Sequence, residues 1–194
     1  MTRKIARKKV RCSWVPEGDL LYENYHDLEW GIPVREERKI FEFLVLESMQ
    51  AGLSWAIVLK KRENFRKAFA GFYPKKVARF GKKEVARLLK DPSIIRNRLK
   101  IESAINNAKR FLEVKKEFGS FSNYMWRFVG GKPIRHRFRL LKDYPETVKE
   151  AEEFARDLKK RGFKFLGPVV CYSHMQAIGM VNDHVISCFR YKTI

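Results

Sequence analysis

Apolar residues recur along most of the chain at the spacing that places them on one face of an α-helix. The alternation of apolar and polar residues that is typical of a β-strand is sparse. The pattern predicts helices over residues 35–50, 56–70, 94–119, 121–131 and 145–161, short helices within 73–92 interrupted at Gly81 and Pro92, a helix after residue 168 that runs to about Gly179, and a short last helix from about Asn182. We therefore predict an all-α fold.

One glutamate stands inside the apolar run FLVLESMQAGLSW, residues 43–55. On a helix, Glu47 lies on the same side as Phe43 and Leu44, and apolar neighbours cover most of the other faces. A carboxylate buried there loses its hydration, so it needs a partner or a proton. Two interpretations stay open: a buried salt bridge to one of the many lysine or arginine residues, or a carboxylate that lines a pocket for a cationic ligand.

Composition and charge narrow the class of protein. A chain of 194 residues can bury one sizeable core. Its 42 basic residues against 22 acidic ones give a net charge of +20, which favours nucleic acid as a partner, with an anionic membrane surface second. Basicity that serves only solubility or thermal stability is the plainer alternative. No run of about 18 apolar residues is present to span a bilayer. Residues 1–10 predict a flexible basic arm, because no apolar stretch follows them as in a secretory signal.

Cysteine and histidine gather near both ends of the sequence. Three cysteines without a secretory signal predict a reducing cytosol and no disulfide framework. In VNDHVISC, His184 and Cys188 would share one face of a helix, and Cys12 and His26 lie near the N-terminus. These four are the ligand types of a tetrahedral zinc site filled entirely by protein, which would tie the two ends of the chain together. Two buried cysteines and two unrelated histidines are the alternative.

The turn RGFKFLGP, residues 161–168, lies between two predicted helices and has a glycine near each end. This pattern is that of a helix-hairpin-helix, in which glycines let the backbone approach a phosphate and the following helix presents free N–H groups. Because a turn with two glycines is common, the basic charge of the chain is what favours DNA binding here. The residues assigned to DNA contact are Lys160, Arg161, Gly162, Lys164 and Gly167.

Six blocks occur in one order along the chain: RCSWV at 11–15, YENYHDLEWGIPV at 22–34, LESMQAGLSWAIVLKKRENFRKAF at 46–69, IIRNRLKI at 94–101, LKKRGFKFLG at 158–167 and CYSHMQAIGMVNDHVISC at 171–188. With them the chain resembles the DNA-3-methyladenine glycosylases of type I, within the helix-hairpin-helix glycosylase superfamily. The resemblance extends over nearly the whole chain. Residues 133–154 match the family poorly, and their cationic side chains would add DNA contacts or form a solvated face.

The resemblance implies a two-lobed helical bundle, with residues 11–194 as a single domain and a base-binding pocket between the lobes. It implies an enzyme that flips 3-methyladenine out of alkylated double-stranded DNA and hydrolyses its N-glycosidic bond. It implies one structural zinc ion, because Cys12, His26, His184 and Cys188 match the family's four ligands in type and order. The partners would be DNA and the damaged base and not a membrane, and the protein would act as a cytoplasmic monomer on the nucleoid.

Under the same resemblance Glu47 matches the glutamate that contacts the flipped base, and it is the residue assigned to catalysis. Adenine methylated at N3 within DNA is cationic, so a desolvated carboxylate would bind it more strongly than normal adenine, and aromatic faces would help for the same reason. Leu53 matches the residue that wedges into the duplex as the base leaves. The other residues assigned to the base pocket are Tyr22, Tyr25, Trp30, Gln50 and Trp55.

Two positions indicate a monofunctional enzyme that leaves an abasic site. Asn182 stands where the wider superfamily has a catalytic aspartate, and Val169 where its lyases place a nucleophilic lysine. Catalysis would then depend on the lability of an already cationic lesion. Three alternatives remain: activity on another alkylated purine such as 3-methylguanine, a binder of damaged DNA that does not hydrolyse it, and a plain zinc-stabilised nucleic-acid-binding module.

Overall fold

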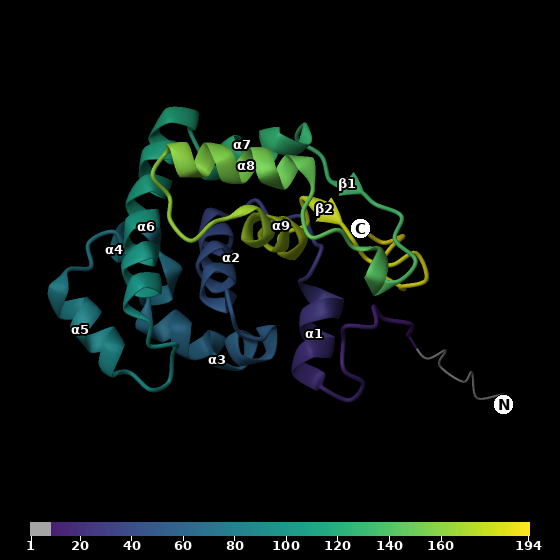
Figure 1. Cartoon of the computed structure of the whole chain (residues 1–194), viewed down its shortest axis with the longest axis horizontal. Helices are drawn as coiled ribbons and strands as arrows, with labels where there is room; N and C mark the ends of the chain where they lie inside the picture. The colour runs from purple at the N-terminus through teal and green to yellow at the C-terminus, as the bar shows by residue number, and fades with distance from the viewer. Residues whose placement is uncertain (1–8) are drawn as a thin grey trace, which may run out of the picture.

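The computed structural model describes residues 9–194, so most of the predicted arm of residues 1–10 lies outside the described residues. The described part is mostly helical (Figure 1), which confirms the predicted all-α class. Its α-helices are α1 (Leu20–Leu28), α2 (Glu37–Gln50), α3 (Trp55–Ala68), α4 (Pro74–Val77), α5 (Lys82–Lys90), α6 (Arg98–Phe118), α7 (Phe121–Trp126), α8 (Lys149–Lys160) and α9 (Pro168–Ala177). Short 3-10 turns, η1 (Ala70–Phe72), η2 (Arg127–Val129) and η3 (Leu141–Asp143), connect some of them.

Polar side chains and one glycine set several helix ends. Asp19 accepts hydrogen bonds from the first N–H groups of α1, and Asn97 and Ser120 do the same for α6 and α7. Gly119 ends α6 with a positive φ of 77°, a conformation that glycine adopts without strain. The hydrophobic pattern did not predict α1, although Asp19 is the signal that could have found it. Helix α8 begins at Lys149, later than the predicted start at 145.

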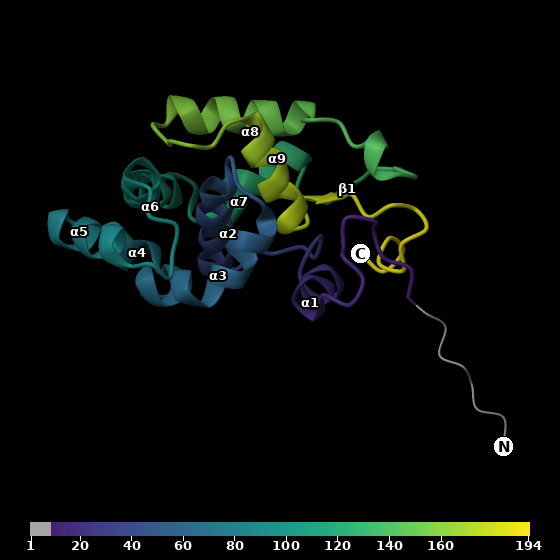
Figure 2. The same cartoon turned by 60° about the horizontal axis from the view of Figure 1, so that its bottom comes forward.

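Helix α2 lies in the middle of the molecule, where α3, α6, α7 and α9 pack around it (Figures 1 and 2). Every residue from Ile40 to Met49 is buried, because apolar side chains cover all faces of this stretch. Helices α4, α5 and α6 lie at one end of the molecule, and the described N-terminal segment and the C-terminus lie together at the other (Figure 1). One hydrophobic core extends from Cys12 to Cys188 through both ends.

The prediction of a last helix from about Asn182 is wrong. Residues 181–182 form the short strand β2 (Val181–Asn182), which pairs in parallel with β1 (Ile134–Arg135), with Ile134 opposite Val181. The rest of the chain follows in turns. The Asn182 amide donates to the backbone carbonyls of Tyr191 and Ile194, and these tertiary bonds replace the local bonds that a helix would make. The shared helical face assigned to His184 and Cys188 is therefore also wrong, since both lie after β2.

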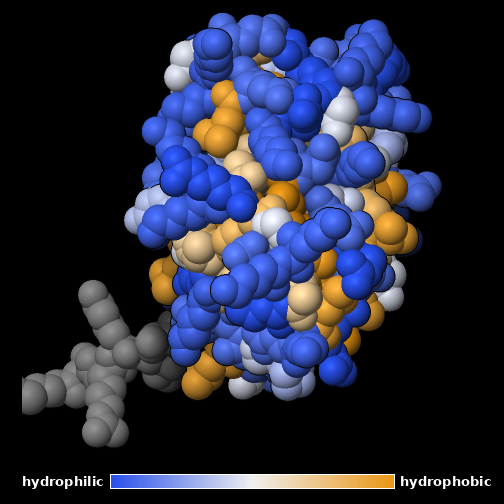
Figure 3. Space-filling model, turned by 90° about the vertical axis from the view of Figure 1, so that its left-hand side faces the viewer, coloured by the Kyte–Doolittle hydropathy of each residue, from blue (hydrophilic) through white to orange (hydrophobic). Residues whose placement is uncertain are grey.

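Hydrophilic side chains cover most of the face at the α4–α6 end, and hydrophobic residues appear there in small separate patches (Figure 3). Among residues 9–194, no helix combines the length and the apolar character needed to cross a bilayer.

Candidate active site and metal cluster

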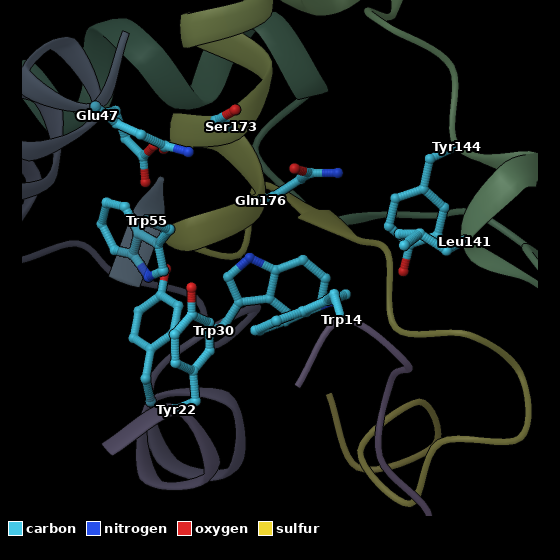
Figure 4. A pocket seen from close by; sticks show the side chains of 11 residues that line it. Trp14, Tyr22, Trp30, Glu47, Trp55, Leu141, Tyr144, Ser173 and Gln176 are labelled. Carbon is cyan, nitrogen blue, oxygen red and sulfur yellow. The ribbon is translucent and has the colours of Figure 1, made fainter. Parts of the chain in front are cut away.

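A cavity of about 280 Å³ opens between α1, the α2–α3 junction, α9 and the segment that follows β1 (Figure 4). The structure brings all six residues assigned to the base pocket to its wall. Sequence reasoning missed five further lining residues. The cavity is lined by Trp14, Tyr22, Tyr25, Trp30, Glu47, Gln50, Trp55, Leu141, Tyr144, Ser173 and Gln176.

Glu47 supplies the only carboxylate among the described residues of this wall. Its side chain is 4% exposed, and within residues 9–194 no group forms a hydrogen bond or ion pair with it. Burial raises the pKa of Glu47 to about 8, with no opposing charge to lower it. The structure therefore excludes the salt-bridge interpretation for Glu47 within the described chain, and leaves a carboxyl group that faces a cavity.

The buried salt bridge on α2 is made by Glu42, which precedes Glu47 on the same helix. Arg62 donates to Glu42 at 2.6 Å, and Arg66 donates to the same oxygen at 2.7 Å. The other end of the Arg62 guanidinium forms two hydrogen bonds with Glu29, at 2.8 and 2.9 Å. Arg62 and Arg66 both belong to α3, and neither forms a hydrogen bond or ion pair with Glu47.

Aromatic rings form much of the cavity wall, and Trp55, Tyr22 and Trp30 lie below Glu47 in Figure 4. The Tyr25 and Trp55 ring centroids lie 5.3 Å apart, and those of Trp14 and Trp30 lie 4.9 Å apart. The Trp55 indole N–H is buried and has no hydrogen-bond partner in the described part of the chain. Burial raises the pKa of Tyr25 well above its usual range, so its phenol stays neutral. Flat π-faces beside a buried carboxyl group suit a planar, electron-poor ligand.

The residues that sequence reasoning missed come from three segments. Trp14 lies within the block RCSWV, in which the sequence points only to Cys12 as a functional residue. Ser173 and Gln176 belong to α9, whose sequence carries no sign of which face borders a cavity. Leu141 and Tyr144 come from the stretch at 133–154, of which only the cationic side chains carry a sequence-based prediction, DNA contact or a solvated face. Only tertiary packing places these segments at one site.

Cys12, His26, His184 and Cys188 converge on one point in the interior. All four are buried, and their ligand atoms lie within 4.8 Å of one another. Cys188 Sγ is 3.5 Å from His26 Nε2 and 3.5 Å from His184 Nδ1, and Cys12 Sγ is 3.6 Å from His184 Nδ1. The group could hold a metal ion, and it joins the two ends of the chain as predicted.

Each histidine of the cluster is oriented by a second hydrogen bond. His26 Nδ1 bonds to Asp27 at 2.8 Å, and His184 Nε2 donates to the backbone carbonyl of Trp30 at 3.2 Å. These bonds direct the opposite ring nitrogens toward the two sulfur atoms, as in sites whose outer partners fix the ligand tautomer. The Trp30 ring also packs on the His184 ring, at 4.6 Å between centroids. Since Trp30 lines the cavity, the cluster supports one wall of it.

The turn that carries Leu53 borders a second hollow, which shares Glu47, Gln50 and Ser173 with the cavity. This hollow is lined by Glu47, Gln50, residues 51–53, Val169, Val170 and Ser173. Leu53 is 40% exposed there. The buried ammonium group of Lys100 donates to the backbone carbonyls of Met49 at 2.9 Å and Ala51 at 2.5 Å, which caps the end of α2 and holds this turn. Leu53, the first residues of α9 and Glu47 therefore all border the same hollow.

The predicted hairpin is present between α8 and α9 (Figure 1). Gly162 has a φ of +81°, and Gly167 caps α9. Side chains of α6 fix the turn: Asn107 exchanges two hydrogen bonds with the backbone of Lys164, at 2.8 and 2.9 Å. Lys160 and Lys164 are exposed. Arg161 is instead paired with Asp157 at 2.8 Å and with Glu117 at 2.6 Å, so it holds α8 to α6.

The two positions that indicated a monofunctional enzyme lie apart from the cavity wall. Asn182 is buried, and its amide groups bond to backbone atoms, with Oδ1 accepting from His184 N–H at 3.2 Å. Val169 is 48% exposed at the start of α9 and borders the hollow beside Leu53. Neither residue offers a charged or nucleophilic group to the cavity.

Comparison with known proteins points to one family of enzymes. A family model described as methyladenine glycosylase matches residues 14–191. DNA-3-methyladenine glycosylase 1 of Escherichia coli (strain K12) is 46% identical over 181 residues, which is 93% of this chain and 96% of that protein. The crystal structure of a 3-methyladenine DNA glycosylase I superposes with a TM-score of 0.90 at 47% identity, covering 93% of this chain and 98% of the other.

A structure that describes 3-methyladenine recognition by the glycosylase I of Staphylococcus aureus superposes with a TM-score of 0.89 at 38% identity, covering 92% of this chain and 95% of that one. Fold and site together thus define a helical DNA glycosylase. The chain belongs to the methyladenine glycosylase family. This confirms the resemblance found in the sequence.

Proposed function

We propose that this protein binds alkylated double-stranded DNA as a monomer, flips 3-methyladenine into the cavity and hydrolyses its N-glycosidic bond. The observation that carries the proposal is Glu47, a buried carboxyl group without a partner in the described chain that faces a cavity walled by aromatic rings. We further propose that residues 11–194 work as one glycosylase domain. The cavity supports this assignment, because its lining residues come from segments that extend from Trp14 to Gln176 along the chain.

Recognition of the lesion follows from charge. An N3-methylated adenine in DNA carries a positive charge that normal adenine lacks. The approach of this cation favours loss of the Glu47 proton to water, because an opposite charge nearby stabilises the carboxylate form. In a site from which water is excluded, the attraction between the cation and that carboxylate is much stronger than in solution, and the base also stacks on the neighbouring aromatic faces. Normal adenine gains none of the ionic attraction, so it leaves a buried carboxyl group without a charged partner.

In the chemical step the bond between the sugar C1′ and N9 of the base breaks, and its electron pair stays with the base. Because the methylated base starts as a cation, it leaves as a neutral molecule and needs no proton from an acid. Water then adds to C1′ and loses a proton, which gives an abasic site. The proposed role of Glu47 is to hold the base and to stabilise the positive charge that shifts toward the sugar.

We infer that Leu53 fills the gap left in the duplex by the extruded base, since it is exposed on the turn beside Glu47. The hairpin would hold the backbone of the DNA through Gly162, Gly167 and the side chains of Lys160 and Lys164. Arg161 contributes to this surface through its ion pairs, which fix the turn, so the structure favours a supporting role for it.

We propose that the Cys2His2 cluster holds one structural zinc ion. Zinc–sulfur bonds of about 2.3 Å and zinc–nitrogen bonds of about 2.0–2.1 Å at tetrahedral angles would separate sulfur and nitrogen by about 3.6 Å. The 3.5 and 3.6 Å separations between these atoms fit that geometry. A bound zinc would supply a cross-link between the chain ends. One zinc per chain by elemental analysis, and a lower melting temperature after chelation, are expected; metal-free protein of unchanged stability would contradict the assignment.

Base release tests the function. Methylated duplex DNA is incubated with the purified protein, and the free bases are separated by chromatography. We expect 3-methyladenine to be released while 7-methylguanine stays in place, and we expect Glu47→Gln to lose release while its salt-sensitive affinity for undamaged DNA stays close to that of the wild type. No release by folded protein from DNA shown to carry the lesion would favour a non-catalytic binder instead.

We also propose that the enzyme does not cut the strand. The aliphatic side chain of Val169 in place of an amine, and the absence of a lysine from the described cavity wall, support this. The product should be an intact strand with an abasic site, and borohydride should trap no covalent complex with DNA. A trapped Schiff-base complex would show a lyase activity.

A further inference from the structure

Gln176 reaches the cavity from the last turn of α9, and one end of its amide is already engaged. Its Nε2 donates a hydrogen bond to Asp183 Oδ2 at 2.8 Å. In Figure 4 the amide nitrogen points toward the side of Tyr144, and the amide oxygen points toward the side of Ser173 and Glu47. The oxygen is therefore the end of the amide that faces the part of the cavity where Glu47 lies.

Asp183 is 1% exposed, and donors hold it on both carboxylate oxygens. The Tyr172 hydroxyl donates to Oδ2 at 2.5 Å, and His136 Nδ1 bonds to Oδ1 at 2.6 Å. The Tyr144 hydroxyl donates to the main-chain carbonyl of the same residue. With its position fixed in this way, the carboxylate can move little to suit a different orientation of Gln176.

A carboxylate accepts hydrogen bonds and does not donate them. The Gln176 amide must therefore turn its NH2 group toward Asp183. In the reversed orientation the amide oxygen Oε1 would face Asp183 Oδ2, and two hydrogen-bond acceptors would repel each other. The same restriction fixes Oε1 toward the cavity as an acceptor. The oxygen and the NH2 group of an amide have nearly the same shape, so either can face the cavity unless a neighbour decides. Here Asp183 only accepts hydrogen bonds, and this makes Gln176 selective.

We propose that Asp183 fixes Gln176 Oε1 as a hydrogen-bond acceptor in the cavity, and that this acceptor selects a methylated purine with an exocyclic amino group over one with a carbonyl at that position. This inference rests on the proposed function. Adenine presents an N6 amino donor, whereas guanine presents the O6 acceptor on the corresponding edge. N3-methylated adenine gains a hydrogen bond with Oε1, and N3-methylated guanine meets a repulsive pair of oxygens. Asp183 and His136 are thus positioning residues for specificity.

The stretch at 133–154 acquires a role in this arrangement. Strand β1 pairs with β2, and His136 N–H donates to the Asn182 carbonyl at 3.2 Å, which brings the His136 ring beside Asp183. The same stretch supplies Leu141 and Tyr144 to the cavity wall. This segment, which matches the family poorly in sequence, therefore builds the side of the pocket that fixes Gln176.

The test compares two substitutions with one control on the same carboxylate. Asp183→Asn gives Gln176 an amide partner that can donate, so Gln176 is free to turn its NH2 group into the cavity. Gln176→Met removes the acceptor while keeping a side chain of similar length. The control, Tyr172→Phe, removes a hydroxyl that donates to the same Asp183 oxygen and also adjoins the Gln176 amide, but it leaves the carboxylate facing Gln176. Each protein is matched for zinc content and melting temperature, because Asp183 adjoins a residue of the metal cluster.

The readout is the ratio of single-turnover rates for release of 3-methyladenine and 3-methylguanine from the same methylated duplex. We expect Asp183→Asn and Gln176→Met to lower this ratio about tenfold or more, and Tyr172→Phe to keep it within about threefold. A loss of rigidity alone would slow both releases in proportion and leave the ratio unchanged.

An unchanged ratio in folded Gln176→Met overturns the inference, and this variant decides the matter if Asp183→Asn does not fold. A fall in the ratio for Tyr172→Phe equal to that for Asp183→Asn would also overturn it, because the polarity of the partner would then be irrelevant. Failure of the wild type to release 3-methyladenine would instead defeat the proposed function.

Discussion

Substitution of Glu47 by glutamine should stabilise the protein, and the gain should increase with pH. Burial raises the pKa of Glu47 from an ordinary value of 4.5 to about 8. Between these two values the unfolded chain has lost the proton and the folded protein still holds it. Folding then requires uptake of a proton, so the stability of the wild type falls as pH rises through this window. Glutamine does not titrate, so the variant does not suffer this loss.

The size of the effect follows from about 1.4 kcal/mol for each pH unit between the two pKa values. The wild type should lose about 1 kcal/mol of unfolding free energy by pH 5 and about 3 kcal/mol by pH 7, and the loss should level off near 5 kcal/mol above pH 8. The variant should therefore exceed the wild type by a margin that grows over this range.

Guanidinium unfolding midpoints of the two proteins at pH 5, 7 and 8.5, with equal metal content, measure this margin. Glu42→Gln is the matched control on the same helix. It weakens the buried ion pairs with Arg62 and Arg66, so it should destabilise the protein at every one of these pH values.

A stability difference between Glu47→Gln and the wild type that does not change with pH would refute the reasoning, because it would mean that the folded carboxyl group ionises as it does in the unfolded chain. The variant is also expected to lose excision. A more stable but inactive protein is the result expected where a strained group serves the reaction.

Three further substitutions have expected outcomes. His174→Phe should raise the unfolding free energy by about 1–3 kcal/mol, because both ring nitrogens are buried without a partner in the described chain. Burial lowers the pKa of His174 from 6.5 to about 3, so this gain should grow as the pH of the unfolding assay falls below 6.5. Gly179→Ala should lower the melting temperature far more than Gly18→Ala: both glycines have positive φ, but a Cβ at Gly179 would lie 2.4 Å from a backbone carbon whereas none lies within 4 Å of Gly18. Arg62→Met should lower the free energy of unfolding, measured with denaturant, by about 3 kcal/mol, because Glu42 stays buried with one ion pair fewer. An unchanged free energy of unfolding would show that the Arg62–Glu42 ion pair does not stabilise the protein.

Local patterns in the sequence determined most of the helices. The spacing of apolar residues fixes which side of a helix can be buried, and residues such as Gly119 end a helix through their own backbone preference. The four residues of the Cys2His2 cluster were also predictable from the sequence, because cysteine and histidine are common ligands of zinc. The helix predicted from Asn182 failed because its backbone bonds to β1 and its side chain to the chain end, partners that no local pattern contains.

The tertiary structure alone decided which of two buried carboxylates has ion-pair partners and which faces the cavity without one. Glu42 and Glu47 stand on the same helix within one apolar stretch, and the sequence offers both a salt bridge and a pocket as explanations for such a residue. Arg62 and Arg66 of α3 reach only Glu42. Glu47 faces the cavity of about 280 Å³ and has no ion-pair partner in the described chain. The polarity of Gln176 was decided in the same way, by an aspartate beyond the end of its helix. In both cases the property depends on what lies opposite the residue in space, and the fold sets that.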